Sequence, residues 1–406
     1  QPLTAAAQGD FSLLWHHIGE GLGIVGLTGD SFWRYNIAGR PLLPLWMALL
    51  FLVGLGLAGW WIVGADRLSA LPGAGKMPAL PAFLAVVWLF LGLSPVLVTG
   101  ARLSTTQAMG MQPVLYLFPA LALRHGVKWL AAQHPTWARG AWAALLLLFG
   151  TTAVLTYHAY FNVWANHPDV RVEYETTLVT AMAYLNQQGS GKTATSTPLS
   201  TATSTPLSAS VSTIAPHAVH SPAVAAMTLH NTEVALSWFD GRNSLLLPAG
   251  ASSTILFPGF TPLNPALDPY FETAVLATTL PLRDTDRDRP LNIYQVDSNA
   301  MRQQWDAQFT RHDPIQFGEN ATFLGYDLHT PTVQPGEVVS IATRWQAERP
   351  FAAGVLFTQI LGADNQPLAQ ADYLSVPSDL WQPGDQFIQL HQMTIPEDIL
   401  PGDYPL

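Results

Sequence analysis

The sequence contains no cysteine and few charged residues. Without cysteine, this chain has no disulfides, cysteine-ligated zinc, iron–sulfur clusters or thiol catalysis. Lys, Arg, Asp and Glu make up 11% of the 406 residues, whereas typical globular domains carry about 25%. Apolar residues make up 49%. This composition argues against a uniformly soluble protein.

The charges are divided unevenly along the chain. Residues 1–161 hold eight of the 18 basic residues but only four of the 28 acidic ones, so the remainder is strongly acidic. An acidic second part argues against nucleic acid as a partner, because binding phosphates requires clustered Lys and Arg. No Asp or Glu occurs between Arg67 and Pro168. This absence weakens a transporter interpretation, because ion pathways place ionisable groups inside the membrane.

Long apolar stretches predict a membrane region over residues 41–161. A helix needs about 20 mostly apolar residues to cross the hydrocarbon core. We predict about four spanning helices, at 42–64, 80–98, 109–123 and 140–161. The third is the weakest because it is short and contains Pro113 and Pro119, and a re-entrant or buried helix is the alternative.

The basic residues predict the orientation of these helices. With four spans, two loops hold Arg67, Lys76, Arg124, Lys128 and Arg139, and the loop between them holds only Arg102. Loops rich in Lys and Arg face the cytoplasm. We therefore predict that residues 1–40 and everything after about 161 are extracytoplasmic. Residues 1–40 form a loop with an amphipathic interfacial helix, in which the neighbouring His16 and His17 point about 100° apart and make a poor metal pair.

Three segments resemble a known family. The segment GDSFWRYNIAGRP at 29–41 directly precedes a predicted span, and MQPVLYLFPALAL at 111–123 and AYFNVWANHPDVRVEY at 159–174 follow it. Together they resemble bacterial GT-C membrane glycosyltransferases of the dolichyl-phosphate-mannose protein mannosyltransferase type, family 39. The resemblance implies an enzyme of the bacterial cell membrane that transfers a sugar from a polyprenyl-phosphate donor to a glycan or protein acceptor. None of the three segments is a catalytic signature.

The sequence departs from this family in two places. Gln107 stands where the family's pattern has an arginine before the third span. The family's catalytic base lies in an acidic motif of the first extracytoplasmic loop, and this chain holds no such upstream loop. We therefore expect a C-terminal fragment whose catalytic residues lie upstream of Gln1.

Candidate contacts for the lipid phosphate lie in the segment 29–41. Sugar transfer needs cationic groups to stabilise the departing phosphate, and the guanidinium groups of Arg34 and Arg40 suit phosphate oxygens. Asp30 is the nearest carboxylate. The alternatives are arginines that face solvent or lipid headgroups, and a turn role for Asp30 after Gly29. No cofactor is evident, no metal site is predicted, and the lipid-linked sugar is a substrate.

The second half of the chain predicts four further segments: an exit helix at 162–190, a Ser/Thr/Pro low-complexity linker at 191–212, a small α/β domain at 213–300 and an incomplete β-sandwich at 315–406. In the linker the octapeptide TATSTPLS occurs twice without change. Such composition cannot bury enough apolar area to fold. The predicted fold class is a multi-pass α-helical membrane region followed by an extracytoplasmic α/β domain and a truncated C-terminal antiparallel β-sandwich.

Several residues of the second half tempt a functional interpretation. We interpret His217, His220 and His230 as loop histidines, because their spacing matches no compact metal motif. Asp284, Asp286 and Asp288 alternate with arginines that would oppose a cation, so we predict a solvated charged turn. Trp345, Tyr373 and Trp381 could stack on sugar rings, but packing in the core is favoured. These features leave open a membrane-anchored carbohydrate- or protein-binding module without catalytic activity.

Overall fold

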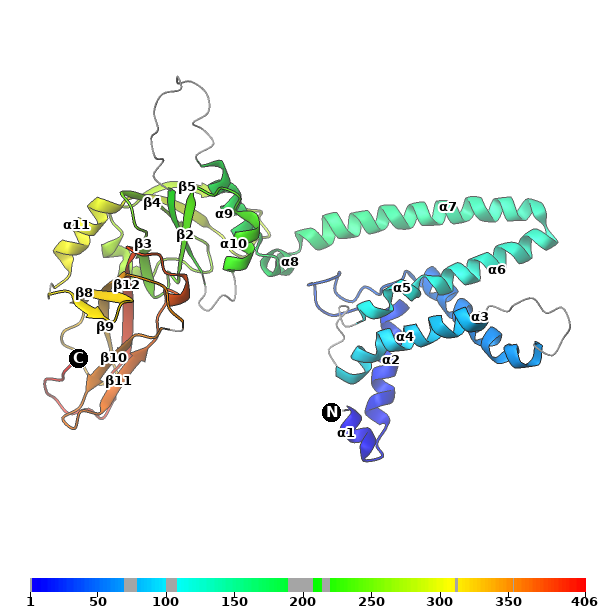
Figure 1. Cartoon of the computed structure of the whole chain (residues 1–406), viewed down its shortest axis with the longest axis horizontal. Coiled ribbons are helices and arrows are strands. Elements are labelled where there is room, and N and C mark those ends of the chain that lie inside the picture. The colour runs from blue at the N-terminus through cyan, green and yellow to red at the C-terminus, as the bar shows by residue number, and fades with distance from the viewer. Residues whose placement is uncertain are drawn as a thin grey trace, which may run out of the picture. The chain divides into compact units, whose positions relative to one another are not determined.

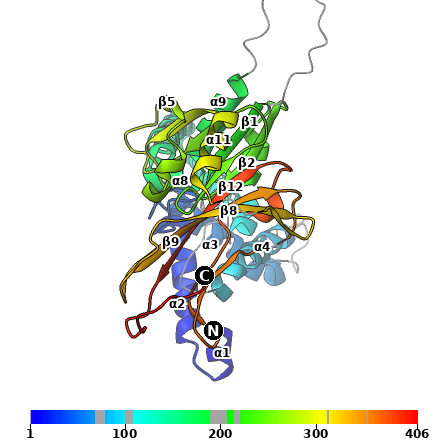
Figure 2. The same ribbon diagram turned by 90° about the vertical axis from the view of Figure 1, so that its left-hand side faces the viewer.

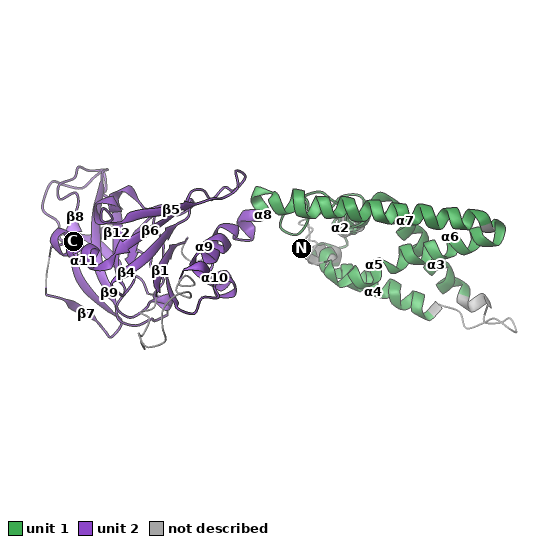
Figure 3. Cartoon of the chain, turned by 90° about the horizontal axis from the view of Figure 1, so that it is seen from above, with its two compact units in different colours: residues 1–170 green, residues 171–406 purple. Residues whose placement is uncertain are grey.

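The computed structural model describes residues 2–68, 79–99, 108–188, 207–213, 220–310, 313–352 and 354–406. It divides into two compact units, Gln1–Val170 and Arg171–Leu406 (Figure 3). Unit 1 is helical, whereas strands dominate unit 2. Lys76, Arg102, Gln107 and His217 lie outside the described residues, and so does most of the predicted linker, from 191 to 206.

Unit 1 is built from helices of very different lengths (Figure 1). They are α1 (Pro2–Ala7), α2 (Ser12–Gly26), α3 (Leu45–Leu68), α4 (Ala79–Thr99), the turn η1 (Met109–Met111), α5 (Gln112–Leu115), α6 (Leu117–Gln133) and α7 (Pro135–Tyr157). Helices α3 and α6 pack closely, because Gly54 lets the backbone at Phe118 approach: a Cβ at Gly54 would lie 1.9 Å from the Phe118 carbonyl oxygen. The Phe118 ring meets Phe51 edge-on at 5.3 Å.

The predicted multi-pass membrane region is wrong. Within the described residues, only Leu45–Gly64 and Thr136–Asn166 are long and apolar enough to span a membrane. In α4 the apolar stretch whose side chains the structure describes is Leu80–Val96, and this stretch is shorter than the about 20 residues that a span requires. The predicted span 109–123 is divided among η1, α5 and the start of α6. Pro113 and Pro119 explain the division, because proline lacks the N–H that an uninterrupted helix needs.

Unit 2 contains a mixed five-stranded sheet with the order β2-β1-β4-β6-β5. Its strands are β1 (Leu207–Ser212), β2 (Val234–Phe239), β4 (Ser252–Phe257), β5 (Val275–Leu280) and β6 (Leu291–Asp297). Strand β1 runs parallel to β2 and β4, whereas β6 runs antiparallel to β4 and β5. The helices of this unit are α8 (Pro168–Glu173, which begins just before it), α9 (Thr176–Gln187), α10 (Pro222–Thr228) and α11 (Ser298–Gln308). The predicted exit helix is thus divided into α8 and α9 at Glu175, whose φ is +50°.

The predicted end of the linker at residue 212 is wrong. Leu207–Ser212 forms the strand β1, which lies inside the mixed sheet. Ala209 and Val211 are fully buried, and they pack in one cluster with Leu178 of α9. Ser210 and Ser212 on the other face are also buried, and the Ser212 hydroxyl donates to the Thr261 carbonyl oxygen at 2.7 Å. A serine-rich segment can therefore be a buried strand when its hydroxyls find acceptors.

A second, antiparallel sheet has the order β3-β12-β9-β8-β7. Its strands are β3 (Ser244–Leu247), β7 (Ile315–Phe317), β8 (Ala321–Leu328), β9 (Val338–Ala347) and β12 (Gln386–Thr394), and a separate hairpin joins β10 (Phe357–Leu361) to β11 (Pro367–Asp372). Strand β3 lies between β2 and β4 in the sequence but pairs with β12. The predicted segment 213–300 therefore contributes β3 to the sheet of the segment 315–406, and Figure 2 shows strands of both segments within the same unit.

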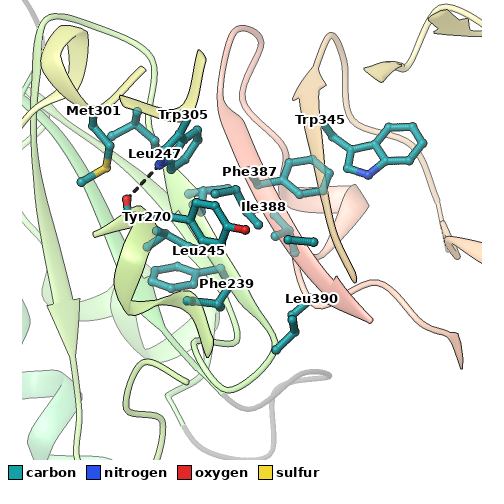
Figure 4. Close-up of a cluster of buried hydrophobic side chains, with 14 of the residues drawn as sticks. Phe239, Leu245, Leu247, Tyr270, Met301, Trp305, Trp345, Phe387, Ile388 and Leu390 are labelled. Atoms are coloured by element: carbon teal, nitrogen blue, oxygen red, sulfur yellow. Dashed lines mark hydrogen bonds between the residues drawn. The ribbon is translucent and has the colours of Figure 1, made fainter. Parts of the chain in front are cut away.

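The two sheets share one hydrophobic core (Figure 4). Phe239 and Leu245 from the first segment meet Phe387 and Leu390 from β12 in this cluster, all of them buried. Trp305 of α11 is also fully buried there, and its indole Nε1 donates to the Tyr270 carbonyl oxygen at 2.9 Å. The mixed sheet and the antiparallel sheet are thus held by the same buried side chains.

His391 of β12 makes the stability of unit 2 depend on pH. Its ring is fully buried beside the Thr343 hydroxyl, and burial lowers its pKa to about 4, whereas an unfolded histidine titrates near about 6.5. The unfolded chain therefore binds a proton between pH 6.5 and 4 that the folded chain does not. We predict that the free energy of unfolding falls by about 3 kcal/mol as pH drops through this window. Denaturant titrations at each pH measure the loss.

A pair of variants isolates this effect. His391→Gln removes the titrating ring, so its unfolding free energy is expected to vary less between pH 6.5 and 4 than that of the parent. His230→Gln changes an exposed histidine and is expected to keep the parent's pH profile. A His391→Gln profile as steep as the parent's would contradict the assignment.

Candidate functional site

The predicted phosphate-contact residues lie on one structured loop between α2 and α3. The amide of Gly29 donates to the Gly39 carbonyl at 3.0 Å, and the Gly39 amide donates back to the Asp30 carbonyl at 2.6 Å. Both glycines are required by the backbone: Gly39 has φ +74°, and a Cβ at Gly29 would lie 1.8 Å from the Arg40 carbonyl oxygen. The two ends of the loop are thereby closed against each other.

Asp30 holds this loop from inside. Its side chain is only 3% exposed, and Oδ1 accepts the Phe32 amide at 2.9 Å. This is the turn role that the sequence offered as the alternative to a functional carboxylate. An acceptor hydroxyl would have poor access to this group, so Asp30 is a weak candidate for a catalytic base.

The two arginines lie on the outside of the loop. Arg34 is exposed, and its guanidinium carbon stands 5.5 Å from the centre of the Tyr35 ring. Arg40 is half-buried, and its Nη2 lies 3.4 Å from the Thr156 hydroxyl at the end of α7. Guanidinium groups in such positions can contact the oxygens of a phosphate.

The loop is fastened to the chain that follows α7. The indole Nε1 of Trp164 donates to the Trp33 carbonyl oxygen at 2.6 Å, across 131 residues of sequence. The Trp33 ring stacks on His167 with 3.6 Å between the ring centres and 6° between the planes. The segments 29–41 and 159–174, which carry the family resemblance, are therefore in direct contact. The sequence did not predict this contact, although the resemblance already included both segments.

The end of α7 has an unusual backbone and an aromatic surface. After Tyr157 the helix widens into a π-helical turn, His158–Val163, and then tightens into the 3₁₀ turn Trp164–Asn166. Such π turns occur frequently at functional sites. Tyr157, Tyr160 and Phe161 are exposed here, and aromatic side chains of this kind favour the membrane–water interface. We call these three residues with Trp33 and Trp164 the aromatic collar.

The structure corrects the predicted solvated turn at 284–288. Of its three aspartates, Asp284 is exposed, whereas Asp286 and Asp288 are buried. The guanidinium of Arg171 contacts both carboxylate oxygens of Asp286, with 2.9 Å between Nη2 and Oδ2. Burial raises the pKa of Asp286, but its contacts with Arg171 and Arg283 outweigh this and lower the pKa below its ordinary value. The buried pair of Arg171 and Asp286 therefore joins this turn to α8, and we call this pair the buried anchor.

The two described histidines of this region, His220 and His230, have different surroundings. His220 is fully buried, has φ +63° and places Nε2 2.8 Å from Asp288 Oδ2. His230 is exposed. Within the described ranges, no group of three or more His, Asp or Glu side chains is arranged to hold a metal ion. No local pattern in the sequence predicts the His220–Asp288 pair, because the two residues are 68 positions apart.

Trp345, Tyr373 and Trp381 pack in the core, the interpretation favoured from the sequence over sugar stacking. Trp345 and Trp381 are 7% and 4% exposed. Their indole groups donate inward, to the Thr343 hydroxyl and the Val376 carbonyl, and the Tyr373 hydroxyl donates to the Leu390 carbonyl at 2.9 Å. The hydrogen bonds of all three side chains and the low exposure of the two indoles favour a role in packing.

An open groove of about 880 Å³ lies beside the antiparallel sheet. Its lining includes Phe317, Phe323, Trp345 and residues 355–359. None of the described residues that line it carries a charge. Its size falls within the about 300–1,000 Å³ of ligand sites.

No protein-family model, curated protein or solved structure matches this sequence. The resemblance to family 39 therefore rests on the three sequence segments themselves.

The loop depends on the acceptor oxygen of Asp30. Asp30→Ala removes it, and losing one such hydrogen bond costs about 1 kcal/mol. We predict faster hydrogen exchange across the amides of 29–40 in Asp30→Ala, measured by mass spectrometry. Asp30→Asn keeps an oxygen at the same place and is expected to exchange like the parent. Equal protection in all three proteins would show that the carboxylate does not hold the loop.

The buried anchor gives a second prediction. Arg171→Met leaves the Asp286 carboxylate buried without its cation, which destabilises proteins by about 3–5 kcal/mol. The matched control is Arg289→Met, because Arg289 pairs with the exposed Asp284 at 3.0 Å and such pairs contribute about 0–1 kcal/mol. Denaturant unfolding of both variants provides the comparison. Similar losses for the two variants would argue against the anchor.

Proposed function

We propose that this chain is part of a bacterial membrane glycosyltransferase that takes its sugar from a polyprenyl-phosphate donor on the extracytoplasmic face. The observation that carries the proposal is the contact between the loop 29–40 and the end of α7, through Trp33, Trp164 and His167. These two segments resemble the same family from distant parts of the sequence, and here they form a single structure that carries two arginines.

The two candidate spans support a membrane location for this structure. None of the most apolar stretch of α7 is buried within the structure, and Leu146 and Leu147 are 73% and 74% exposed. Water would disfavour such a surface, whereas lipid tails would accept it. Because Arg40 lies beside Thr156, the start of α3 and the end of α7 are at the same end of unit 1. In the proposed arrangement both helices span, so residues 1–44 and the end of unit 1 at 167–170 lie on one side of the membrane.

The aromatic collar and the two arginines suit the lipid headgroup region. Exposed Tyr and Phe side chains would fix the depth of the loop. Arg34 and Arg40 would contact the phosphate of the donor and stabilise the negative charge that develops on it as the sugar departs. We assign no catalytic base in this chain, because Asp30 is buried and already holds the loop. The proton acceptor is proposed to come from another part of the protein.

Lipid binding tests the role of the arginines. Arg40→Ala is expected to weaken binding of undecaprenyl phosphate about tenfold, because a charge-assisted hydrogen bond contributes about 1.5–3 kcal/mol. Native mass spectrometry or fluorescence competition in lipid nanodiscs measures the change, and Arg34→Ala is tested alongside. The control is Arg139→Ala. Arg139 is an exposed arginine of α7, about 25 Å along the helix axis from Thr156, which Arg40 contacts. Parent-like affinity in Arg34→Ala, Arg40→Ala and the double variant would refute the phosphate contact.

Sugar transfer tests the enzymatic part. Membranes that contain the intact protein are supplied with radiolabelled polyprenyl-phosphate sugars, and label is followed into glycan and protein fractions. We expect transfer that Arg40→Ala lowers and Arg139→Ala preserves. Absence of transfer from every such donor would refute the proposed activity.

A second candidate is a membrane-anchored binding module without catalytic activity. The groove of unit 2 favours it, because an open, uncharged depression of this size is typical of binding sites. The two candidates are compatible, since a glycosyltransferase can also bind its acceptor through a separate module.

A further inference from the structure

A separate pocket of unit 2 lies beyond the carboxyl end of strand β4. It has a volume of about 260 Å³, and all of its described lining residues fall between 257 and 294, in the mixed sheet and its connections. Strands β2, β1 and β4 run parallel, so their carboxyl ends meet at this edge of the sheet. Open α/β sheets bind ligands at this edge. The position therefore makes the pocket a candidate binding site.

Three aromatic rings in mutual contact line this pocket. Phe257 is buried, and its ring meets those of Phe271 and Tyr294 edge-on, with 5.5 Å and 5.9 Å between the ring centres. The rings of Phe271 and Tyr294 are 5.0 Å apart, and both residues are half-buried. Edge-to-face contacts of this kind are favourable. The three rings therefore hold one another in place, and two of them keep apolar surface available to a ligand.

Three polar groups accompany the aromatic rings. Asn292 lies two positions before Tyr294 in β6, so both side chains are on the same face of the sheet. Its Oδ1 accepts the Thr279 hydroxyl of β5 at 2.8 Å, which leaves its N–H groups for a ligand. Asp268 is exposed and lies in the turn η5 (Pro265–Tyr270). Within the described ranges, neither its carboxylate nor the Tyr294 hydroxyl has a hydrogen-bond partner.

The backbone around the pocket is held by buried contacts. The Phe271 amide donates to the Asp268 carbonyl at 2.9 Å, and the end of η5 is fixed where Trp305 Nε1 donates to the Tyr270 carbonyl. Gly259 lets the loop after β4 approach the next connection, because a Cβ there would lie 2.3 Å from the carbonyl oxygen of residue 289. A site that is formed before its ligand arrives loses less entropy on binding.

The polar groups select one class of ligand. Among the described lining residues, Asp268 carries the only charge. A phosphate or carboxylate would face this anion without a cation to balance it. An ammonium ion would pair with Asp268, but it has no acceptor to offer the Asn292 N–H groups. A hydroxyl group both donates and accepts, so a ligand with several hydroxyl groups can bond to all three side chains.

We propose that this pocket binds a neutral sugar ring, whose C–H groups pack against the aromatic rings and whose hydroxyl groups bond to Asp268, Asn292 and Tyr294. Small-molecule sites typically combine an apolar lining with a few convergent polar groups. The volume is slightly below the about 300–1,000 Å³ of such sites, so the pocket fits one ring of a glycan. This inference gives the binding module proposed above a ligand class and a site apart from the groove. It does not depend on sugar transfer.

Glycan binding tests the proposal on the full chain in nanodiscs. A glycan array is probed with these nanodiscs, and empty nanodiscs give the background. The neutral glycan with the strongest signal is then titrated, and saturation-transfer NMR measures its Kd. We expect saturable binding that neither tetramethylammonium nor inorganic phosphate displaces.

Two variants test the polar contacts without changing the size of the pocket. Asp268→Asn removes the anionic acceptor and is expected to weaken glycan binding about tenfold, whereas Tyr294→Phe removes one hydroxyl and is expected to weaken it about fivefold. Both should keep the parent's thermal unfolding, because neither group bonds to the described protein. The matched control is Asp313→Asn, which changes an exposed aspartate outside the pocket and is expected to bind like the parent.

Photochemical labelling locates the bound glycan. A diazirine derivative of the same glycan is irradiated on the protein, and mass spectrometry identifies the labelled peptides. We expect the label between residues 257 and 294.

Four results would overturn the proposal. They are the absence of any neutral glycan signal above empty nanodiscs, displacement by tetramethylammonium or phosphate, binding within twofold of the parent in both variants, and a label on the groove at 315–359. Asp268→Asn is expected to bind undecaprenyl phosphate like the parent, and Arg34 and Arg40 take no part in glycan binding. The lipid site and the sugar pocket can therefore fail separately.

Discussion

The pairing of β3 with β12 is the constraint on which unit 2 depends. All four residues of β3 are buried, because the strand lies where the mixed sheet and the antiparallel sheet meet. The same side chains therefore stabilise both sheets, and neither sheet has a complete core without the other. This sharing also fixes the groove, since β9, which forms part of its wall, pairs directly with β12. A binding surface built on such a frame needs little rearrangement, which lowers the entropic cost of binding.

Unit 1 depends on a different kind of constraint, the fastening of a loop to a helix end. The hydrogen bond from Trp164 to Trp33 and the stack of Trp33 on His167 join segments that flank the two candidate spans. Through these contacts the arginines keep a defined position beside the aromatic collar. The proposed phosphate site therefore comes from tertiary contacts between aromatic side chains, while the charged groups themselves make few contacts that hold the loop.

The sequence predicted some of these features and missed others for physical reasons. Apolar length identified Leu45–Gly64 and most of Thr136–Asn166, because hydrophobic periodicity and length are local properties. It failed at 109–123, where Pro113 and Pro119 interrupt the helix. The site arginines and the turn role of Asp30 were also visible locally, but their attachment to α7 was not. The buried Asp286 was predicted as solvated because its local sequence is highly charged, whereas its partner Arg171 lies 115 residues earlier. The serine-rich β1 was missed because burial between two strands overrides composition.

The pairing of β3 with β12 has a consequence for the order of folding. The Gln389 side chain of β12 donates to the Asn243 carbonyl, 146 residues earlier. Contacts of such long sequence separation form slowly, because a large loop must close first. During synthesis from the N-terminus, Leu245–Leu247 have no partner strand until β12 has emerged, which begins 139 residues after Leu247 (386 − 247). Until then they are an unpaired apolar strand, and exposed strands of this kind lead to aggregation in multidomain proteins. A cell that makes this protein must protect that strand until its partner arrives.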